Sequence, residues 1–250
     1  MTHPIIEAVD LHFSYPDGTR ALRGVSFTVQ PGEALALVGA NGAGKSTLLQ
    51  HLVGAAFPSR GALHVGGLPV DSGHLPALRK RVGMVFPDPD DQLFMPTVAQ
   101  DVAFGPRNLG LAPGDVEARV RAALETVDAL ALAGKPPYRL SSGEKRRVAI
   151  ATALALEPEI LVMDEPTSGL DPRSRRHLAE LLKAFGHTMV IATHDLDLVL
   201  DLCPRTLVIH EGVLAADGPT RDIFRNEGLL ATCHLEKPLS MQGCPFCGPS

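Results

Sequence analysis

The stretch Gly39–Ser46, with the sequence GANGAGKS, has glycines, a lysine and a serine at the spacing G-x-x-x-x-G-K-[ST]. It follows an apolar run and precedes a helical pattern, which is the context that this phosphate-binding loop requires. Its glycines let successive backbone N–H groups turn toward an anion, and the helix start adds further donors. The pattern predicts a site for a nucleoside triphosphate with Mg²⁺, in which Lys45 reaches the β- and γ-phosphates and Ser46 binds the metal. The residues assigned to this site are Gly39, Asn41, Gly42, Gly44, Lys45, Ser46 and Thr47.

Two further apolar runs end in residues that suit phosphoryl transfer. The run ILVMDEP places Asp164 and Glu165 at a strand end, and VIATHD places His194 at another. Ligands of parallel sheets bind at the carboxyl ends of strands. We therefore expect Asp164 to contact Mg²⁺ and Glu165 to act as general base or to orient the attacking water. His194 is expected at the γ-phosphate, and the catalytic set is Lys45, Glu165 and His194. Each motif alone could be a solvated turn, but together with the phosphate loop they favour catalysis.

The stretch LSSGEKRRVAIA offers a second helix start and two interpretations. The spacing Ser141-x-x-Glu144 is a capping box, which begins a helix without any further function. The same residues also leave a helix N-terminus able to bind an anion. Because the chain already has its own phosphate loop, a second such helix start indicates that phosphate is contacted twice, with a second copy of the chain as the candidate for the second contact. The candidate residues are Ser141, Ser142, Gly143 and Glu144.

Short apolar strands alternate with helical patterns along most of the chain, which favours an α/β fold with a parallel sheet and crossover helices. A helical block interrupts this alternation, with helices predicted at Val98–Phe104, Asp115–Ala131 and Gly143–Leu156. After Asn226 the periodicity is weak. We therefore divide the chain into a nucleotide-binding core (1–86 and 158–225), a helical insertion (87–157) and a C-terminal tail (226–250).

The composition excludes several classes of protein. The chain has 250 residues, 45% hydrophobic and 20% charged, with a net charge of −5, so no basic surface predicts a nucleic-acid partner. No apolar run reaches the length of a membrane span, and the N-terminus does not resemble a signal peptide. These observations favour a cytoplasmic protein that reaches a membrane only through partners.

Over residues 5 to about 225, the order and spacing of these motifs resemble the ATP-binding subunits of ABC transporters. GANGAGKST resembles the Walker A loop, LSSGE the signature, ILVMDE the Walker B strand, SGLD the D-loop and His194 the switch histidine. The resemblance implies a P-loop NTPase fold, with a RecA-like parallel sheet, an antiparallel β subdomain and an inserted helical subdomain. It also implies that Tyr15, in FSYPDG, stacks on adenine. A half-buried strand aromatic is the alternative for that residue.

The same resemblance implies the mechanism. Two subunits, identical or paralogous, face head to tail and trap two ATP molecules with Mg²⁺. Ser141 and Gly143 of the opposite signature complete each γ-phosphate shell, and Asp171 of the D-loop lies across the interface. Here Ser142 and Glu144 replace the usual Gly and Gln. Because the first serine and the backbone N–H are retained, we expect little loss from this departure.

The segment PDPDDQLF resembles energy-coupling-factor and cobalt-type importers. That family joins the ATPase to a transmembrane coupling protein and a substrate-binding membrane subunit, at the cytoplasmic face of the membrane, for cobalt, nickel or vitamins. The cargo stays open. The alternatives are the ATPase of an exporter, a soluble ABC ATPase without a transport role, and a degenerate subunit without turnover. The soluble class usually carries two nucleotide domains or a long coiled coil, which this sequence lacks.

Cysteine and histidine residues gather near the C-terminus. A Cys-His pair and a Cys-x-x-Cys pair could supply four ligands for zinc, nickel or cobalt. The alternative is a tail with reduced thiols. The candidate ligands are Cys233, His234, Cys244 and Cys247. Cys203 stands apart and is expected to be a small buried apolar residue.

One position breaks the family pattern. In the family, a glutamine that contacts Mg²⁺ and the attacking water follows the strand corresponding to RVGMVF, and here that position is Pro87. Proline has neither a side-chain oxygen nor a backbone N–H. We therefore expect weaker Mg²⁺ positioning or weaker coupling of hydrolysis to transport. Gln92 is the nearest remaining amide, but it is not assigned the catalytic role.

Overall fold

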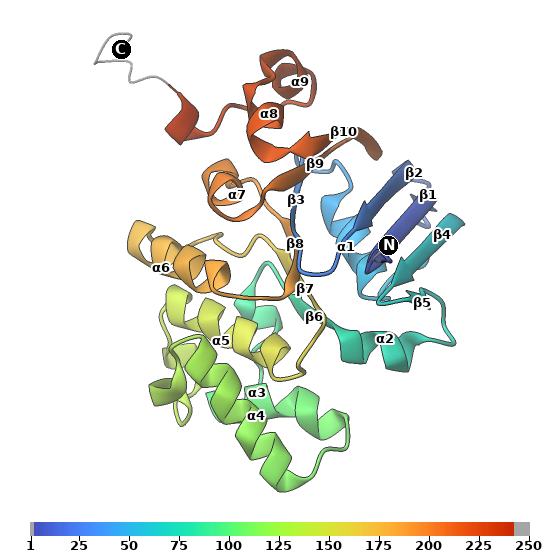
Figure 1. The fold of residues 1–250 in the computed structure, drawn as a ribbon. Helices are drawn as coiled ribbons and strands as arrows, with labels where there is room; N and C mark the ends of the chain where they lie inside the picture. The colour runs from blue at the N-terminus through green and yellow to red at the C-terminus, as the bar shows by residue number, and fades with distance from the viewer. Residues whose placement is uncertain (1–2, 243–250) are drawn as a thin grey trace.

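The computed structural model describes residues 3–242, and its centre is a six-stranded sheet with the order β10-β9-β3-β8-β7-β6 (Figure 1). The neighbours from β9 to β6 are parallel, and β10 joins the edge as an antiparallel hairpin partner of β9. In chain order the strands are β3 (Ala34–Val38), β6 (Val82–Val85), β7 (Ile160–Asp164), β8 (Thr188–Ala192), β9 (Arg205–His210) and β10 (Val213–Pro219). The predicted parallel sheet is therefore present.

A second sheet of four strands is antiparallel, with the order β2-β1-β4-β5. Its strands are β1 (Ile6–Ser14), β2 (Arg20–Val29), β4 (Arg60–Val65) and β5 (Leu68–Pro69). A short turn that contains Pro31 joins the two sheets, because β2 lies in the antiparallel sheet and β3, which follows the turn, lies in the central sheet.

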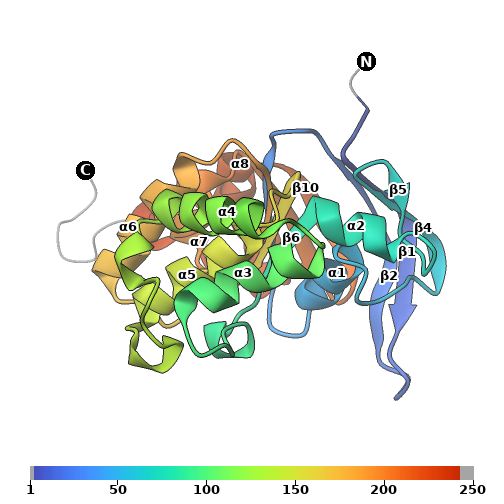
Figure 2. The ribbon, with the colours of Figure 1, turned by 90° about the horizontal axis from the view of Figure 1, so that it is seen from below.

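Helices connect the strands and cover the central sheet. Three of them, α3, α4 and α5, come between β6 and β7 in the sequence and pack against one another. They lie on the opposite side of the molecule from the antiparallel sheet (Figure 2). The helices are α1 (Lys45–Leu52), α2 (Leu75–Arg81), α3 (Val98–Asn108), α4 (Pro113–Thr126), α5 (Ser142–Leu154), α6 (Pro172–Lys183), α7 (Leu196–Leu202), α8 (Thr220–Arg225) and α9 (Glu227–Thr232), with short 3₁₀ turns η1 (Pro89–Asp91), η2 (Leu130–Leu132), η3 (Pro137–Arg139) and η4 (Leu239–Met241).

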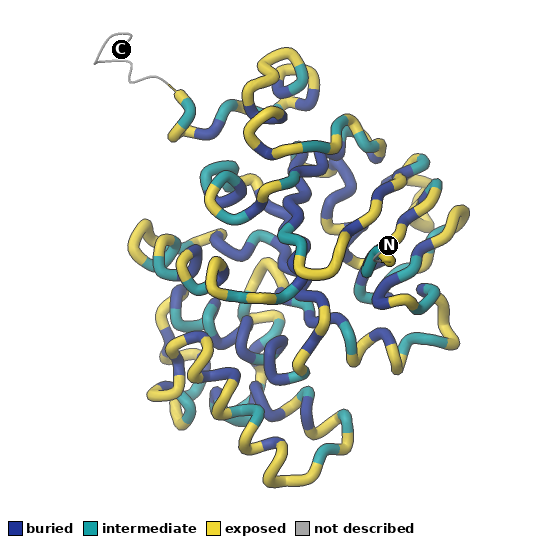
Figure 3. Tube along the Cα trace, viewed as in Figure 1, coloured by how far each residue is buried: buried dark blue, intermediate teal, exposed yellow. Residues whose placement is uncertain are grey.

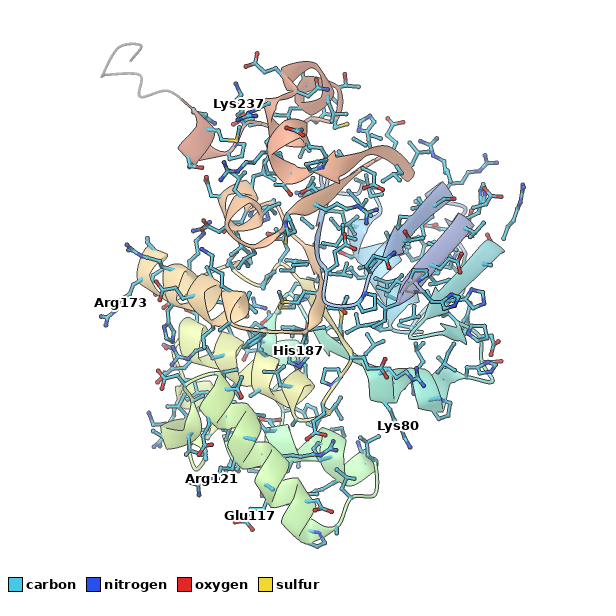
Figure 4. All side chains as sticks on the ribbon, viewed as in Figure 1. Lys80, Glu117, Arg121, Arg173, His187 and Lys237 are labelled. Carbon is cyan, nitrogen blue, oxygen red and sulfur yellow. The ribbon has the colours of Figure 1, made fainter. Side chains whose placement is uncertain are left out.

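Both faces of the central sheet are buried, as its short apolar runs predict. On β3, Leu35 and Leu37 pack toward α1 and the antiparallel sheet, whereas Ala36 and Val38 pack toward the helical side. Figure 3 shows this buried centre flanked by exposed outer surfaces. Side chains on the outer faces of α4 and α6, such as Glu117, Arg121 and Arg173, are exposed and point away from the body of the molecule (Figure 4).

Several predicted boundaries were wrong. The first helix of the block extends past Phe104 to Asn108, and the second ends at Thr126, because the backbone at Asp128 is left-handed with φ 53°. The segment after Asn226, predicted to be a tail, begins with α9, whose Leu230 is buried. No helix among residues 3–242 is both long and apolar enough to cross a membrane.

Candidate active site

A cavity of about 410 Å³ lies where the loop after β3 meets the end of β7. It brings together most residues of the predicted phosphate and metal site. The lining residues are Tyr15, Thr19, Arg20, Ala21, Asn41, Gly42, Gly44, Lys45, Ser46, Thr47, Pro87, Asp164 and Glu165. A larger cleft of about 820 Å³ borders His194 and the C-terminal segment, but it contains none of the phosphate loop. The smaller cavity therefore holds the groups that suit phosphate chemistry.

The phosphate loop folds around the Lys45 ammonium. Lys45 Nζ donates to the carbonyls of Gly39 and Ala40, at 2.7 and 3.1 Å. Gly44 precedes α1 with φ 110°, and a Cβ there would lie 2.5 Å from the carbonyl oxygen of Ala21, so only glycine fits. Burial lowers the pKa of Lys45, although the Glu165 and Asp164 carboxylates act in the opposite direction. The loop thus places one cation beside two acids.

Tyr15 lies at the cavity wall, in the turn between β1 and β2. Its hydroxyl is 2.8 Å from Thr47 Oγ1, and its ring packs edge-to-face against Phe13 with centroids 5.1 Å apart. These contacts fix the ring beside the phosphate loop and leave the side chain partly exposed to the cavity.

Asp164 and Glu165 differ in environment although they are adjacent. Asp164 is 4% exposed, and burial raises the pKa of its carboxyl, whereas the Ser46 hydroxyl and the Lys45 charge lower that pKa. Glu165 has a left-handed backbone, with φ 48°, and its carboxylate accepts from Thr193 Oγ1 at 2.9 Å and from the backbone N–H of His194 at 3.1 Å. The end of β8 therefore holds the Glu165 side chain in place.

His194 does not line the nucleotide cavity. Its Nδ1 lies 2.8 Å from Glu165 Oε2, and its side chain is 70% exposed toward the larger cleft. The structure therefore links His194 to the cavity through Glu165.

The predicted capping box at Ser141 is confirmed. The Ser141 hydroxyl accepts from the Glu144 backbone N–H, and the Glu144 carboxylate accepts from both the N–H and the hydroxyl of Ser141, at 2.8 and 2.9 Å. The residues Ser141 to Glu144 do not line the nucleotide cavity of their own chain. Asp171 caps α6 and is exposed, with its Oδ1 accepting from the N–H groups of Arg173 and Ser174.

The segment that follows β6 contains Pro87, the position where the sequence departs from the family pattern. Pro87 lies in the cavity wall, where it offers no side-chain polar group. Gln92 cannot replace it there, because its amide bridges β6 to α5: Oε1 accepts from Phe86 N, and Nε2 donates to Ala149 O and Thr152 Oγ1. Asp88 caps the 3₁₀ turn η1, and Asp90 pairs with Lys145 at 2.6 Å.

Two residues near the site were not predicted. Thr193 orients Glu165, and the only sequence signal for it is its place beside His194 at a strand end. Arg146 is 2% exposed and contacts the Pro87 carbonyl. Its signal was present in the sequence: it follows Gly143 by three residues and precedes Ile150 by four, which places it on the buried stripe of α5.

The C-terminal metal hypothesis concerns four residues, of which Cys233 and His234 lie in the described part of the chain. Cys244 and Cys247 lie outside the described residues, and Cys233 is 1% exposed within the apolar core. Within residues 3–242, no three His, Cys, Asp or Glu side chains gather in a way that could hold a metal ion. Cys203 is buried, and desolvation raises its pKa to about 12, as expected of a packing residue.

Comparison with known proteins identifies the family of the chain and its fold. The sequence profile of the ABC transporter family matches residues 22–168, more than half of the chain. The chain therefore belongs to that family and is an ATP-binding subunit of a transporter, with the P-loop NTPase fold that its motifs predict.

Individual proteins similar to this chain carry names from the same family. The chain is 63% identical over 248 residues to a putative ABC transporter ATP-binding protein of Geobacter sulfurreducens, covering 99% of this chain and 100% of the relative. It is 45% identical over 239 residues to the energy-coupling factor transporter ATP-binding protein EcfA of Methanocaldococcus jannaschii, covering 94% and 86%. The solved structure of cbiO1 from Clostridium perfringens, part of the ABC transporter complex cbiONQ, matches with a TM-score of 0.82 and 39% identity, covering 92% and 94%.

Proposed function

We propose that this chain binds and hydrolyses ATP with Mg²⁺ and thereby powers a membrane importer of the energy-coupling-factor type. The observation that carries the proposal is the convergence of Lys45, Ser46, Asp164 and Glu165 on one cavity. A cation, a hydroxyl and two carboxylates are the groups that phosphoryl transfer requires. The sequence relatives EcfA and cbiO1 support the type of transporter.

The residues divide the chemistry among them. Lys45 and the N–H groups of the phosphate loop bind the β- and γ-phosphates, and Tyr15 contacts the base. Ser46 and Asp164 suit Mg²⁺, because both offer oxygen ligands and their side chains lie close enough for the Ser46 hydroxyl to influence the Asp164 carboxyl. Bound Mg²⁺ would neutralise charge on the phosphate oxygens.

Glu165 is the proposed general base. Its carboxylate is acceptor-only when ionised and is held by Thr193 and the His194 N–H, so it is oriented before the attacking water arrives. The imidazole of His194, at 2.8 Å, can share the proton that Glu165 takes up.

We infer that the working unit is a dimer of ATP-binding subunits. The signature residues Ser141–Glu144 lie away from the nucleotide cavity of their own chain, so they can contact phosphate only on a second subunit. The helical insertion at 87–157 is the proposed contact for a transmembrane coupling protein, which places the chain at the cytoplasmic face of the membrane. Cobalt and nickel ions are the proposed cargo, with a vitamin as the alternative.

Turnover is tested first on the purified chain. Wild-type protein should release phosphate from ATP, Glu165→Gln should bind ATP but release little, and removal of Mg²⁺ by EDTA should stop release. Absence of ATP binding in the wild type would refute the proposal. Transport is then tested by expressing the chain with the membrane proteins encoded beside it. Uptake of radioactive cobalt or nickel that depends on Glu165 would support an importer, whereas efflux would favour the exporter alternative.

A further inference from the structure

Arg146 is a buried charge on the signature helix α5. It is 2% exposed, and it is among the largest fully buried side chains of the described residues. Its guanidinium donates to three backbone carbonyls: Nη1 to Phe86 at 2.8 Å, Nη2 to Pro87 at 2.6 Å, and Nη2 to Ser168 in a longer contact of 3.5 Å. Burying an arginine is costly unless its donors have partners. The three carbonyls supply partners for both terminal nitrogens, whereas Nε is buried without a partner among the described residues.

The three carbonyls belong to two functional segments. Phe86 and Pro87 directly follow the strand β6, and Pro87 forms part of the nucleotide cavity wall. Ser168 lies in the D-loop, between β7 and α6. One side chain of the signature helix therefore connects the wall of its own nucleotide cavity to the loop expected to face a second subunit. Asp88 and Glu165 are the carboxylates whose charges act on Arg146, which also ties it electrostatically to the proposed base.

Two other contacts join α5 to the segment after β6, but they reach fewer parts of the site. Lys145 pairs with Asp90 at 2.6 Å, and Gln92 bonds to Ala149 and Thr152. Neither pair contains a residue that lines the nucleotide cavity or a residue of the D-loop. Arg146 alone among these three reaches both, because a planar guanidinium presents several donors in a fixed fork, whereas an ammonium acts as a point charge.

We propose that Arg146 is a positioning residue that links the Pro87 wall of the nucleotide cavity to the D-loop and the signature helix, in place of the side chain that Pro87 lacks. The link passes through the Pro87 carbonyl, the one polar group that this proline has. A change at the cavity wall when ATP binds is then transmitted by Arg146 to the two segments that meet the second subunit. This inference rests on the proposed ATPase function.

Hydrogen exchange tests the link directly, without requiring turnover. In the wild type, MgATP should slow exchange at residues 39–47 and also at 142–146 and 167–171. In Arg146→Lys, which keeps the charge but loses the fork, protection should persist at 39–47 and fall at least about threefold at the two distant segments. Lys145→Met is the matched control, because it removes a charge and a contact one residue away, and it should retain the full pattern.

The outcomes separate the two claims. Equal protection at 142–146 and 167–171 in the wild type and in Arg146→Lys overturns the role of Arg146 but does not affect the proposed ATP site. Absence of protection at 39–47 in the wild type overturns the proposed function, and this inference with it. Thermal unfolding of both variants shows whether Arg146→Lys is folded. Should it unfold, Arg146→Gln, which keeps donors at shorter reach, is measured in its place.

A kinetic readout distinguishes positioning from simple loss of structure. Arg146→Lys should lower kcat by about tenfold or more, while the Kd of one subunit for ATP stays within about twofold of the wild type. A parallel loss of ATP affinity and kcat would show that Arg146 only maintains the cavity, and it would overturn the proposal.

Discussion

The helices α1 and α5 both begin at sequences that suit an anion, yet their first turns are built differently. Gly44 precedes α1 in a left-handed conformation, and no side chain caps this end. Ser141 precedes α5, and its capping box with Glu144 occupies the same kind of donors. The first turn of a helix carries N–H groups without intrahelical partners, so the difference decides what those groups can bind.

In the proposed site, the N-terminus of α1 has N–H groups free of side-chain caps, whereas the N-terminus of α5 is capped by its own side chains. At α1 the donors are left for a ligand, beside the Lys45 ammonium. At α5 the Ser141 hydroxyl donates to Glu144, and a carboxylate stands where a phosphate would arrive. Phosphate must displace this contact and approach a like charge. We therefore infer that Glu144 opposes closure of the proposed dimer, a larger effect than the sequence alone predicted for this departure.

The largest effect is expected at the α1 side. Lys45→Ala removes the only side-chain cation that the phosphate loop itself contributes, and should lower ATPase activity by about 100-fold or more. The measurement is phosphate release with saturating MgATP, together with ATP binding by fluorescence. Lys80→Ala, on the exposed face of α2, is the control and should be active (Figure 4). Equal activity of the two variants would show that the cavity is not the catalytic site.

A smaller but more selective effect is expected at the α5 side. Ser141→Arg places a long side chain where the second subunit would bind, and should lower ATPase activity by about 10- to 100-fold. Binding of ATP to a single subunit should be unchanged, because Ser141 does not line the cavity of its own chain. Unchanged turnover would contradict the contact between subunits.

Glu144→Gln tests the difference between the helix starts most directly. Glutamine at this position preserves the capping box but removes the negative charge. ATP-dependent dimerisation should become about 3- to 10-fold tighter, since one like-charge contact is removed. Sedimentation of the catalytically impaired Glu165→Gln background measures it, with Glu117→Gln on the exposed face of α4 as the control. Weaker dimerisation would mean that Glu144 assists closure.

Pro87 lies in the wall of the nucleotide cavity, and its replacement is expected to raise activity. Pro87→Gln restores an amide at the cavity wall and should raise turnover, or transport per ATP hydrolysed, by about 2- to 5-fold. The Pro87 carbonyl, which accepts from Arg146, is retained in this variant. Unchanged turnover and coupling would show that the wall already works without an amide.

The sequence predicted the parallel sheet and the positions of Lys45, Asp164 and Glu165, because short apolar strands and local motifs carry that information. It did not predict that His194 reaches the cavity only through Glu165, since a contact between strand ends depends on tertiary placement. It also missed the hydrogen bond from Arg146 to the Pro87 carbonyl, because every residue has a backbone carbonyl and the sequence does not show which one a side chain will reach. Helix ends such as that after Thr126 were misplaced because periodicity does not report a left-handed residue like Asp128.

The smallest expected effect concerns the capping box itself. The Ser141 N–H holds the pKa of Glu144 below its ordinary value, so the ionised carboxylate stabilises the folded chain. Glu144→Ala should lower the free energy of unfolding by about 0.5–1 kcal/mol at pH 7. Because the folded pKa is depressed, this contribution is complete above about pH 5 and disappears as the pH falls through the folded value. Urea unfolding of both proteins at pH 7 and near pH 3.5 measures the difference. A difference that persisted undiminished at the lower pH would assign it to hydrogen bonds of the uncharged side chain, because alanine favours a helix at least as well as glutamate. It would show that the Glu144 charge does not stabilise α5.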